Sequence, residues 1–311
     1  FLVPKFLPDA DNNAGEGNGA TCGSIEHKMG IKGSATCVMN FDGAEGVLIG
    51  EPHQGLAAMF TMMNHARADV ALQGVAHAAR AYDVASHYAA ERTQGRKADG
   101  SPAVLSDHAD VRRMLDEIDA HALGGRAIAH LAFVTMERGD NPALVEFLTP
   151  VAKAICTEGG MRAAELGVQV LGGYGYLQEY RLEQTYRDAR ITAIYEGANG
   201  IHARMLATRL LAGSEADAFA GFVTSEGFGD HELFALWQQA RAHLAQADDP
   251  TPMAHDFMAL TAAVLLHCIW ARFQAAAASH TDPVRITRVA TGAQARGLAF
   301  GRAHAACLMA H

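Results

Sequence analysis

One glutamate in a short apolar loop is the residue of this sequence whose setting best suits acid–base chemistry. Glu196 follows the apolar step from Ile191 to Tyr195 and precedes Gly197. A carboxylate withdrawn from water holds its proton more tightly, which makes it a stronger base at neutral pH. Most loop glutamates, however, are solvated or cap a helix. The pattern alone leaves both interpretations open.

The elements on either side of Glu196 must position it. Gly172 and Gly173 end a long apolar run, because glycine tolerates positive φ angles and close backbone approach. A tyrosine-rich turn and a charged stretch follow, and Asn199 then precedes a run with helical spacing. We therefore expect a helix that ends at the glycine pair, a polar loop, and a new helix that Asn199 caps.

Composition bounds the class of protein. The chain has 311 residues, half of them hydrophobic, and a net charge of −9, which argues against a nucleic-acid partner or an anionic membrane surface. No apolar run approaches the ~20 residues that span a bilayer, so no membrane insertion is expected. The five cysteines have no CxxC spacing, which favours a reduced compartment and a cytoplasmic location. The 16 histidines form no HExxH motif or Cys/His cluster, so we interpret them as surface or satisfied core residues and expect no metal site.

The hydrophobic period changes once along the chain. Residues 1–50 have β character, and the candidate strands lie at 1–3, 20–25, 36–41 and 47–49, with a mobile loop at 9–19. From Leu56 the period becomes helical. The predicted helices lie at 56–92, 107–138, 143–171, 229–247, 253–279 and 284–308. The pattern predicts a mainly α protein.

The stretch from Gln169 to Arg209 resembles the C-terminal signature of the flavin-dependent acyl-CoA dehydrogenases. It contains a glutamine, a glycine pair, an aromatic-rich turn, the RDARI run and the YEG triplet in the family's order. The run CGSIEHKMGIKGSATCVMNFDGAEGVLIGE is similar to the second half of the family's middle β-domain. It is closest to the subgroup that includes the 3-methylmercaptopropionyl-CoA dehydrogenases, which carry an extra C-terminal helical module.

This resemblance implies three parts. Residues 1–50 correspond to the second half of the middle β-domain, and residues 51–213 to an up-and-down helical bundle with the flavin and catalytic signature. Residues 214–311 correspond to the additional C-terminal helical module. The expected fold is thus mainly α, with a truncated middle β-domain, and the chain is expected to be a fragment of the enzyme.

The resemblance also implies an activity. Members of the family use FAD to oxidise an acyl-CoA thioester to the 2,3-enoyl-CoA, and Glu196 stands at the position of the base that removes the α-proton. Electron-transfer flavoprotein is the expected electron acceptor. A homo-oligomer, at least a dimer, is expected because the family's flavin contacts cross a subunit boundary.

Individual residues are carried over from the family's motif. The implied substrate contacts are Asn64, Arg67 and Gly197. The implied contacts to the flavin nucleotide are Arg92, His108, Gln169, Gly172, Gly173, Ala198 and Asn199. Relatives usually carry threonine where Ala198 stands, and often glutamine where His202 stands.

Two further interpretations stay open. The first is a non-catalytic helical assembly module that has lost flavin binding, which Ala198 and the missing counterpart of the family's N-terminal parts favour. Joint retention of Glu196, Arg92 and the glycine pair favours the enzyme more strongly. The second is an acyl-CoA oxidase, which differs in oxygen access.

Overall fold

The computed structural model describes residues 1–310, and the side chains of Phe60, Thr61 and Asn64 lie outside the description. The chain divides into two compact units, residues 1–64 and the residues from His65 onward. Each unit is described by itself.

The first unit contains two short antiparallel hairpins. Strand β1 (Phe6–Pro8) pairs with β2 (Ala14–Gly17), and β3 (Ala20–Ile25) pairs with β4 (Cys37–Phe41). Most of their side chains are exposed, so these two-stranded sheets bury little apolar surface.

Three expectations for this unit were wrong in detail. The segments predicted as strands at 1–3 and 47–49 form only an isolated bridge between Leu2 and Val47. The predicted loop at 9–19 contains β2. The Asp9 carboxylate accepts hydrogen bonds from two backbone N–H groups beyond it, which closes the turn of that hairpin.

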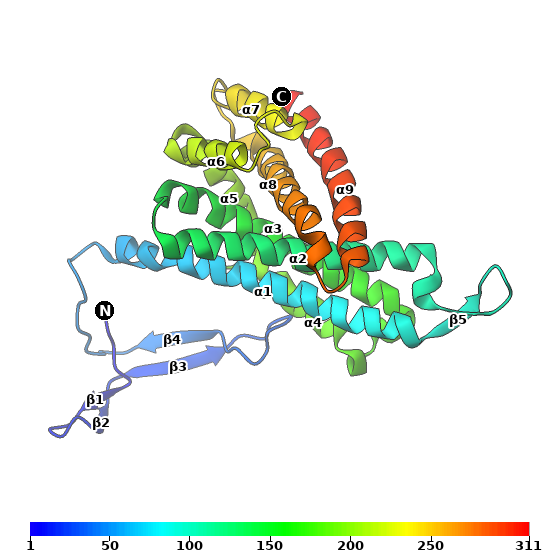
Figure 1. Ribbon diagram of the computed structural model, residues 1–311. Coiled ribbons are helices and arrows are strands. Elements are labelled where there is room, and N and C mark those ends of the chain that lie inside the picture. The colour runs from blue at the N-terminus through cyan, green and yellow to red at the C-terminus, as the bar shows by residue number, and fades with distance from the viewer. Residues whose placement is uncertain (311) are drawn as a thin grey trace. The chain divides into compact units, whose positions relative to one another are not determined.

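Three long helices form the frame of the second unit (Figure 1). They are α1 (Gly55–Glu91), which begins in the first unit, α2 (Ala109–Arg138) and α3 (Pro142–Leu171). A small hairpin joins α1 to α2 and consists of β5 (Thr93–Arg96) and β6 (Pro102–Val104). All three helices were predicted, and their ends moved by one or two residues.

Local chemistry sets the boundaries of α2 and α3. Gly139 ends α2 with a φ of 64°. The Asn141 side chain accepts a hydrogen bond from the Leu144 N–H at the start of α3, and Pro142 occupies the first turn. Gly172 ends α3 with a φ of 60°.

Helices α1 and α3 are in backbone contact. A Cβ added at Gly74 would lie 2.2 Å from the Cys156 carbonyl oxygen, and one at Gly160 would lie 2.6 Å from the Gly74 carbonyl oxygen. Only glycine permits this approach. As a result α3 is buried along most of its length.

In the described part of the chain, six further α-helices follow α3. They are α4 (Leu182–Ala189), α5 (Asn199–Met205), α6 (Ser214–Ser225), α7 (Glu232–Leu244), α8 (Ala254–Ala276) and α9 (Pro283–Met309). The predicted helices at 229–247, 253–279 and 284–308 are confirmed with shorter or shifted ends. Helix α6 was not predicted, and α4 lies in the segment that was expected to be a polar loop, so that expectation was wrong there. Figure 1 shows α8 and α9 side by side. The mainly α fold class is confirmed.

The later helices share a hydrophobic core with α1–α3. Trp237 of α7 is fully buried and packs against Phe147 of α3, Phe219 of α6 and Phe257 of α8. Its indole N–H donates to the Thr261 hydroxyl at 2.9 Å, so no buried donor is left unmet there. The division into 1–50, 51–213 and 214–311 remains a prediction about domains.

One helix is long and apolar enough to cross a membrane by length and composition. It covers Thr251–Ser279, and 78% of its most apolar window is buried against other helices. Because the buried core helix of a globular protein passes the same test, this is weak evidence for a membrane span. The absence of membrane insertion stays a prediction.

A buried ion pair joins α9 to α2. The Arg285 guanidinium donates two hydrogen bonds of 2.7 Å to Asp119, whose side chain is 2% exposed. The hydrogen-bonded carboxylate raises the pKa of Arg285, and the guanidinium also lies over the Tyr82 ring at 4.7 Å.

We predict that Arg285→Ala lowers the free energy of unfolding by about 3 kcal/mol, because it leaves the Asp119 charge buried without its partner. Arg302→Ala is the matched control. Arg302 lies on α9 like Arg285, and it makes the same kind of two-bond ion pair, with Glu232 of α7, but at the surface. That variant should lose less than about 1 kcal/mol. Urea unfolding measures both, and equal losses would contradict this reading of the Asp119 pair.

Candidate active site

The predicted site residues fall into two separate groups. The first group surrounds a cavity of about 650 Å³ at the C-terminal ends of α1 and α3. Of the residues predicted to contact the flavin nucleotide, the lining includes Arg92, Gln169, Gly172 and Gly173.

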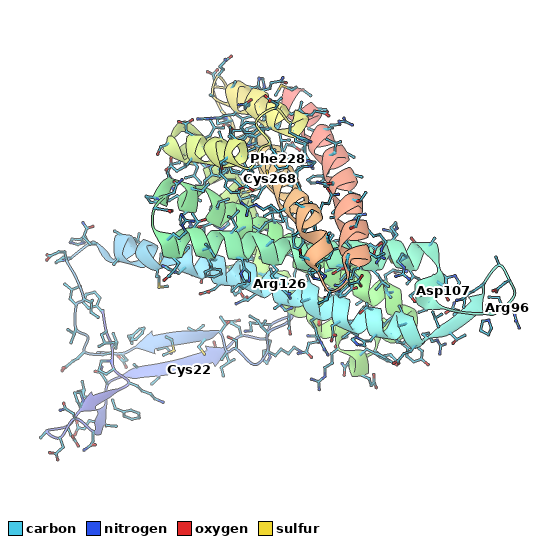
Figure 2. The ribbon with its side chains drawn as sticks, in the orientation of Figure 1. Cys22, Arg96, Asp107, Arg126, Phe228 and Cys268 are labelled. Carbon is cyan, nitrogen blue, oxygen red and sulfur yellow. The ribbon has the colours of Figure 1, made fainter. Side chains whose placement is uncertain are left out.

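Arg92 is held at the rim of this cavity by the end of α1. Its backbone N–H donates to the Tyr88 carbonyl at 2.9 Å, and its guanidinium lies 5.7 Å from the centre of the Tyr174 ring. Tyr88, Tyr174 and Tyr180 pack against one another and form an aromatic cluster beside it. The β5–β6 hairpin beyond carries Arg96, which is labelled in Figure 2.

The glycine pair leaves the backbone of the cavity open. A Cβ added at Gly172 or Gly173 would meet no atom within 4 Å. A ligand can therefore approach the backbone there closely. His108 is not among the lining residues, and its Nε2–H donates to the Gln94 carbonyl oxygen at 2.8 Å. Its predicted flavin contact stays a prediction.

The second group surrounds Glu196, between the end of α4 and the start of α5. Glu196 has a φ of 54° and Gly197 a φ of 90°, so two consecutive residues adopt left-handed backbone conformations. That conformation costs a non-glycine residue roughly 1–2 kcal/mol. The preceding Tyr195 hydroxyl donates to the Gln73 side chain and ties the loop to α1. We call the segment from Tyr195 to Asn199 the Glu196 turn.

Lys153 of α3 lies directly beneath the Glu196 turn, and sequence reasoning missed it. Its side chain is fully buried. Its ammonium group donates hydrogen bonds of 2.9 Å to the Gly197 carbonyl oxygen and 2.9 Å to Asn199 Oδ1. Burial lowers the pKa of Lys153 to about 8, whereas the negative charges of Glu158 and Glu196 oppose this shift.

Asn199 differs from its predicted role as a helix cap. Helix α5 begins at Asn199 itself, with Ala198 at the N-cap position. The Asn199 side chain points inward instead, where its Oδ1 accepts the hydrogen bond from Lys153. Its Nδ2 donates to the Thr157 hydroxyl and to Glu158, each at 3.1 Å. Its predicted contact to the flavin nucleotide stays a prediction.

His202 of α5 supports the Glu196 turn from the other side. Its Nε2–H donates to the Glu196 carbonyl oxygen at 3.2 Å, and a Cβ at Gly197 would lie 2.9 Å from the ring. Burial, followed by the positive charges of Arg67 and Lys153, lowers the pKa of His202 to about 4. Its Nδ1 is buried without a partner, as is Nδ1 of His267, so the expectation that core histidines are satisfied was wrong for these two.

Arg67 interacts electrostatically with the residues around Glu196. Burial is the largest effect on its pKa and lowers it, and Arg209 lowers it further, whereas Glu196 and Glu146 raise it. The predicted substrate-contact residues Arg67 and Gly197 thus lie in one neighbourhood. The Asn64 side chain lies outside the described residues.

Helix α3 separates the two groups. Lys153 contacts the Glu196 turn, and Gln169 lines the cavity. These two residues are 16 positions apart on α3, so the helical rise between them is roughly 24 Å. Within the described part of the chain, no group of three or more His, Cys, Asp or Glu is placed to hold a metal ion.

We predict that His202→Gln reduces the loss of stability at acid pH. The pKa of His202 in the folded protein, about 4, lies below its ordinary value of 6.5. The unfolded chain therefore binds more protons between these values, and stability falls as the pH falls from 6.5 to 4. Glutamine keeps an N–H donor for the Glu196 carbonyl and cannot be protonated in this range.

Denaturant unfolding at pH 7.5, 5.5 and 4.5 measures this effect. One proton corresponds to at most ~1.4 kcal/mol per pH unit, so the variant's slope should be shallower than the wild type's by less than that. Identical slopes would show that His202 does not titrate as its burial requires.

Comparison with known proteins gives the family. The model of the acyl-CoA dehydrogenase C-terminal domain matches residues 53–211. A 3-methylmercaptopropionyl-CoA dehydrogenase of Ruegeria pomeroyi is 42% identical over 221 residues, which are 67% of this chain and 38% of that protein. A broad-specificity linear acyl-CoA dehydrogenase of Mycobacterium tuberculosis is 36% identical over 226 residues, 66% of this chain and 37% of that protein. The chain thus spans about two fifths of the length of these curated relatives.

A solved structure shows the same fold. The acyl-CoA dehydrogenase of Bacillus anthracis, crystallised with FAD, matches with a TM-score of 0.76 at 19% identity, over 93% of this chain and 56% of that chain. The family model covers both the cavity and the Glu196 turn. By its sequence and its fold, the chain belongs to the acyl-CoA dehydrogenase family.

Proposed function

We propose that this chain is part of an FAD-dependent acyl-CoA dehydrogenase that converts an acyl-CoA thioester to the 2,3-enoyl-CoA, with Glu196 as the base. The observation that carries this proposal is the Glu196 turn. A carboxylate stands on a left-handed turn that α1, α3 and α5 each hold, within the region that matches the family. A solvated loop glutamate needs no such support.

The residues of the turn suit proton abstraction next to a thioester. Glu196 removes the α-proton, and negative charge then develops on the substrate. The positive charge of Arg67 interacts with Glu196, and in that place it favours the charge that develops on the substrate. When bound, FAD supplies the acceptor for the hydride that leaves the β-carbon.

The cavity at the ends of α1 and α3 fits the nucleotide part of FAD. Arg92 offers a guanidinium fork that matches phosphate oxygens, and Gln169 offers an amide. The open space before Gly172 and Gly173 admits a phosphate close to the backbone. His108, Ala198 and Asn199 remain predicted contacts, and Ala198 has no hydroxyl to contribute.

A homo-oligomer, at least a dimer, follows from the same proposal. The cavity and the Glu196 turn lie apart along α3, and the cavity residues Arg92, Gln169 and Gly172 are exposed. In a dimer each flavin can take its nucleotide contacts from one subunit and its base from the other. We further propose electron-transfer flavoprotein as the electron acceptor and a cytoplasmic location.

We predict that Glu196→Gln in the full-length protein leaves FAD bound but slows its reduction by acyl-CoA by at least about 100-fold, since the base is lost. Anaerobic stopped-flow absorbance of the flavin band measures the rate. Glu179→Gln is the matched control, because Glu179 is an exposed carboxylate between α3 and α4 that does not line the cavity.

Near-normal bleaching of the Glu196→Gln flavin would overturn the assignment of the base. A colourless wild-type protein that binds no added FAD would favour the helical assembly module instead. Rapid reoxidation of the reduced flavin by oxygen would favour the oxidase.

We predict that Arg92→Ala weakens FAD binding by roughly 10- to 100-fold, which corresponds to the ~1.5–3 kcal/mol of a hydrogen bond to a charged group. Arg96→Ala is the control, because Arg96 lies four residues on, in the β5–β6 hairpin, and donates to the Gly100 carbonyl oxygen. Titration of the apoprotein with FAD measures both dissociation constants. Equal effects of the two substitutions would remove Arg92 from the nucleotide site.

A further inference from the structure

The ammonium group of Lys153 requires an explanation, because a buried charge is expensive unless it is matched. Its side chain has no exposed surface, and transfer of such a group out of water costs several kcal/mol. Among the described residues, no carboxylate lies within 4.0 Å of the amine to form an ion pair. Glu158, the carboxylate with the largest effect on the Lys153 pKa, accepts a hydrogen bond from the Asn199 amide instead. Lys153 therefore does not serve as half of a salt bridge.

Both hydrogen-bond acceptors of Lys153 belong to one short segment. They are the Gly197 carbonyl, one residue after Glu196, and the Asn199 side chain, three residues after it. These bonds span 44 and 46 residues of sequence, so they tie two distant parts of the chain together. One ammonium group on α3 therefore donates to both acceptors.

The backbone of that segment needs such support. Glu196 is a non-glycine residue with a φ of 54°, and such a conformation persists only where the surroundings determine it. His202 donates to the Glu196 carbonyl and Lys153 to the next one. The direction of the Glu196 carboxylate depends on these two successive peptide groups.

We propose that Lys153 is a positioning residue for Glu196: from within α3, its ammonium group holds the Gly197 carbonyl and the Asn199 side chain, and so fixes the turn that aims the carboxylate. This inference rests on the proposed function of Glu196 as base. It adds a residue that does not touch the substrate but sets the geometry of the one that does.

The test compares Lys153→Met with the wild type in the full-length protein. Methionine keeps the length of the side chain and removes all its donors. Thr149→Val is the matched control, because Thr149 is also fully buried on α3 and its hydroxyl bonds only to the Val145 carbonyl of its own helix. Lys153→Arg keeps the charge and the donors and should restore part of the effect.

Two readouts are taken on each variant. The first is hydrogen exchange of the peptide that covers residues 190–204, which should become at least about tenfold faster in Lys153→Met and stay unchanged in Thr149→Val. The second is the rate of flavin reduction at saturating acyl-CoA, which should fall roughly 10- to 100-fold. Both FAD and acyl-CoA are kept at saturating concentration in each variant, so that the fall in this rate reports the effect on the base and not on binding.

The outcomes distinguish the positioning role of Lys153 from the proposed function of Glu196. Exchange and reduction rates like those of the wild type would overturn the positioning role while leaving Glu196 as the base. An equal loss in Thr149→Val would also overturn it, because the effect would then be a general weakening of α3. A wild-type flavin that acyl-CoA does not bleach would refute the proposed function itself, and the positioning role with it.

Discussion

A charged side chain that is buried on a helix must find its partners within the protein, and this constraint shapes the centre of the molecule. Helix α3 is buried because α1 meets it backbone to backbone at Gly74 and Gly160 and because later helices cover its other sides. Lys153 places an ammonium group in that interior. The Glu196 turn supplies the acceptors for this ammonium group. The packing of the bundle and the conformation of the turn therefore depend on each other.

The same helix also sets the distance between the cavity and the Glu196 turn. Its middle carries Lys153 and thereby the Glu196 turn, and its C-terminal end carries Gln169 and the glycine pair. A rigid helix fixes that separation better than any loop would. The fold thus holds the cavity and the Glu196 turn apart on one chain, and the proposal of a homo-oligomer rests on this separation.

Much of the architecture was accessible from the sequence. The helical periods predicted α1, α2 and α3 closely, because glycine, asparagine and proline mark their ends. The glycine pair and Arg92 were expected near one another, and the structure places them around one cavity. That expectation came from resemblance to a family, since spacing alone could not bring Arg92 and Gly172, 80 residues apart, together.

What escaped prediction depends on three-dimensional burial. Lys153 was not singled out from the sequence, although it is the only charged residue between Glu146 and Glu158, a pattern that indicates burial of this stretch. Asn199 was expected to cap its own helix, but that buried amine competes for its side-chain oxygen. Helix-capping propensity depends only on neighbouring residues, so it could not reveal that Asn199 bonds to Lys153, 46 residues away.

The central claim is that the family chemistry operates through these residues. The most direct measurement is the visible absorption spectrum of the full-length protein, before and after addition of a short-chain acyl-CoA under argon. The account predicts a flavin band that bleaches on addition of the thioester. A protein that stays colourless in the presence of FAD, or a flavin band that no acyl-CoA changes, would contradict it.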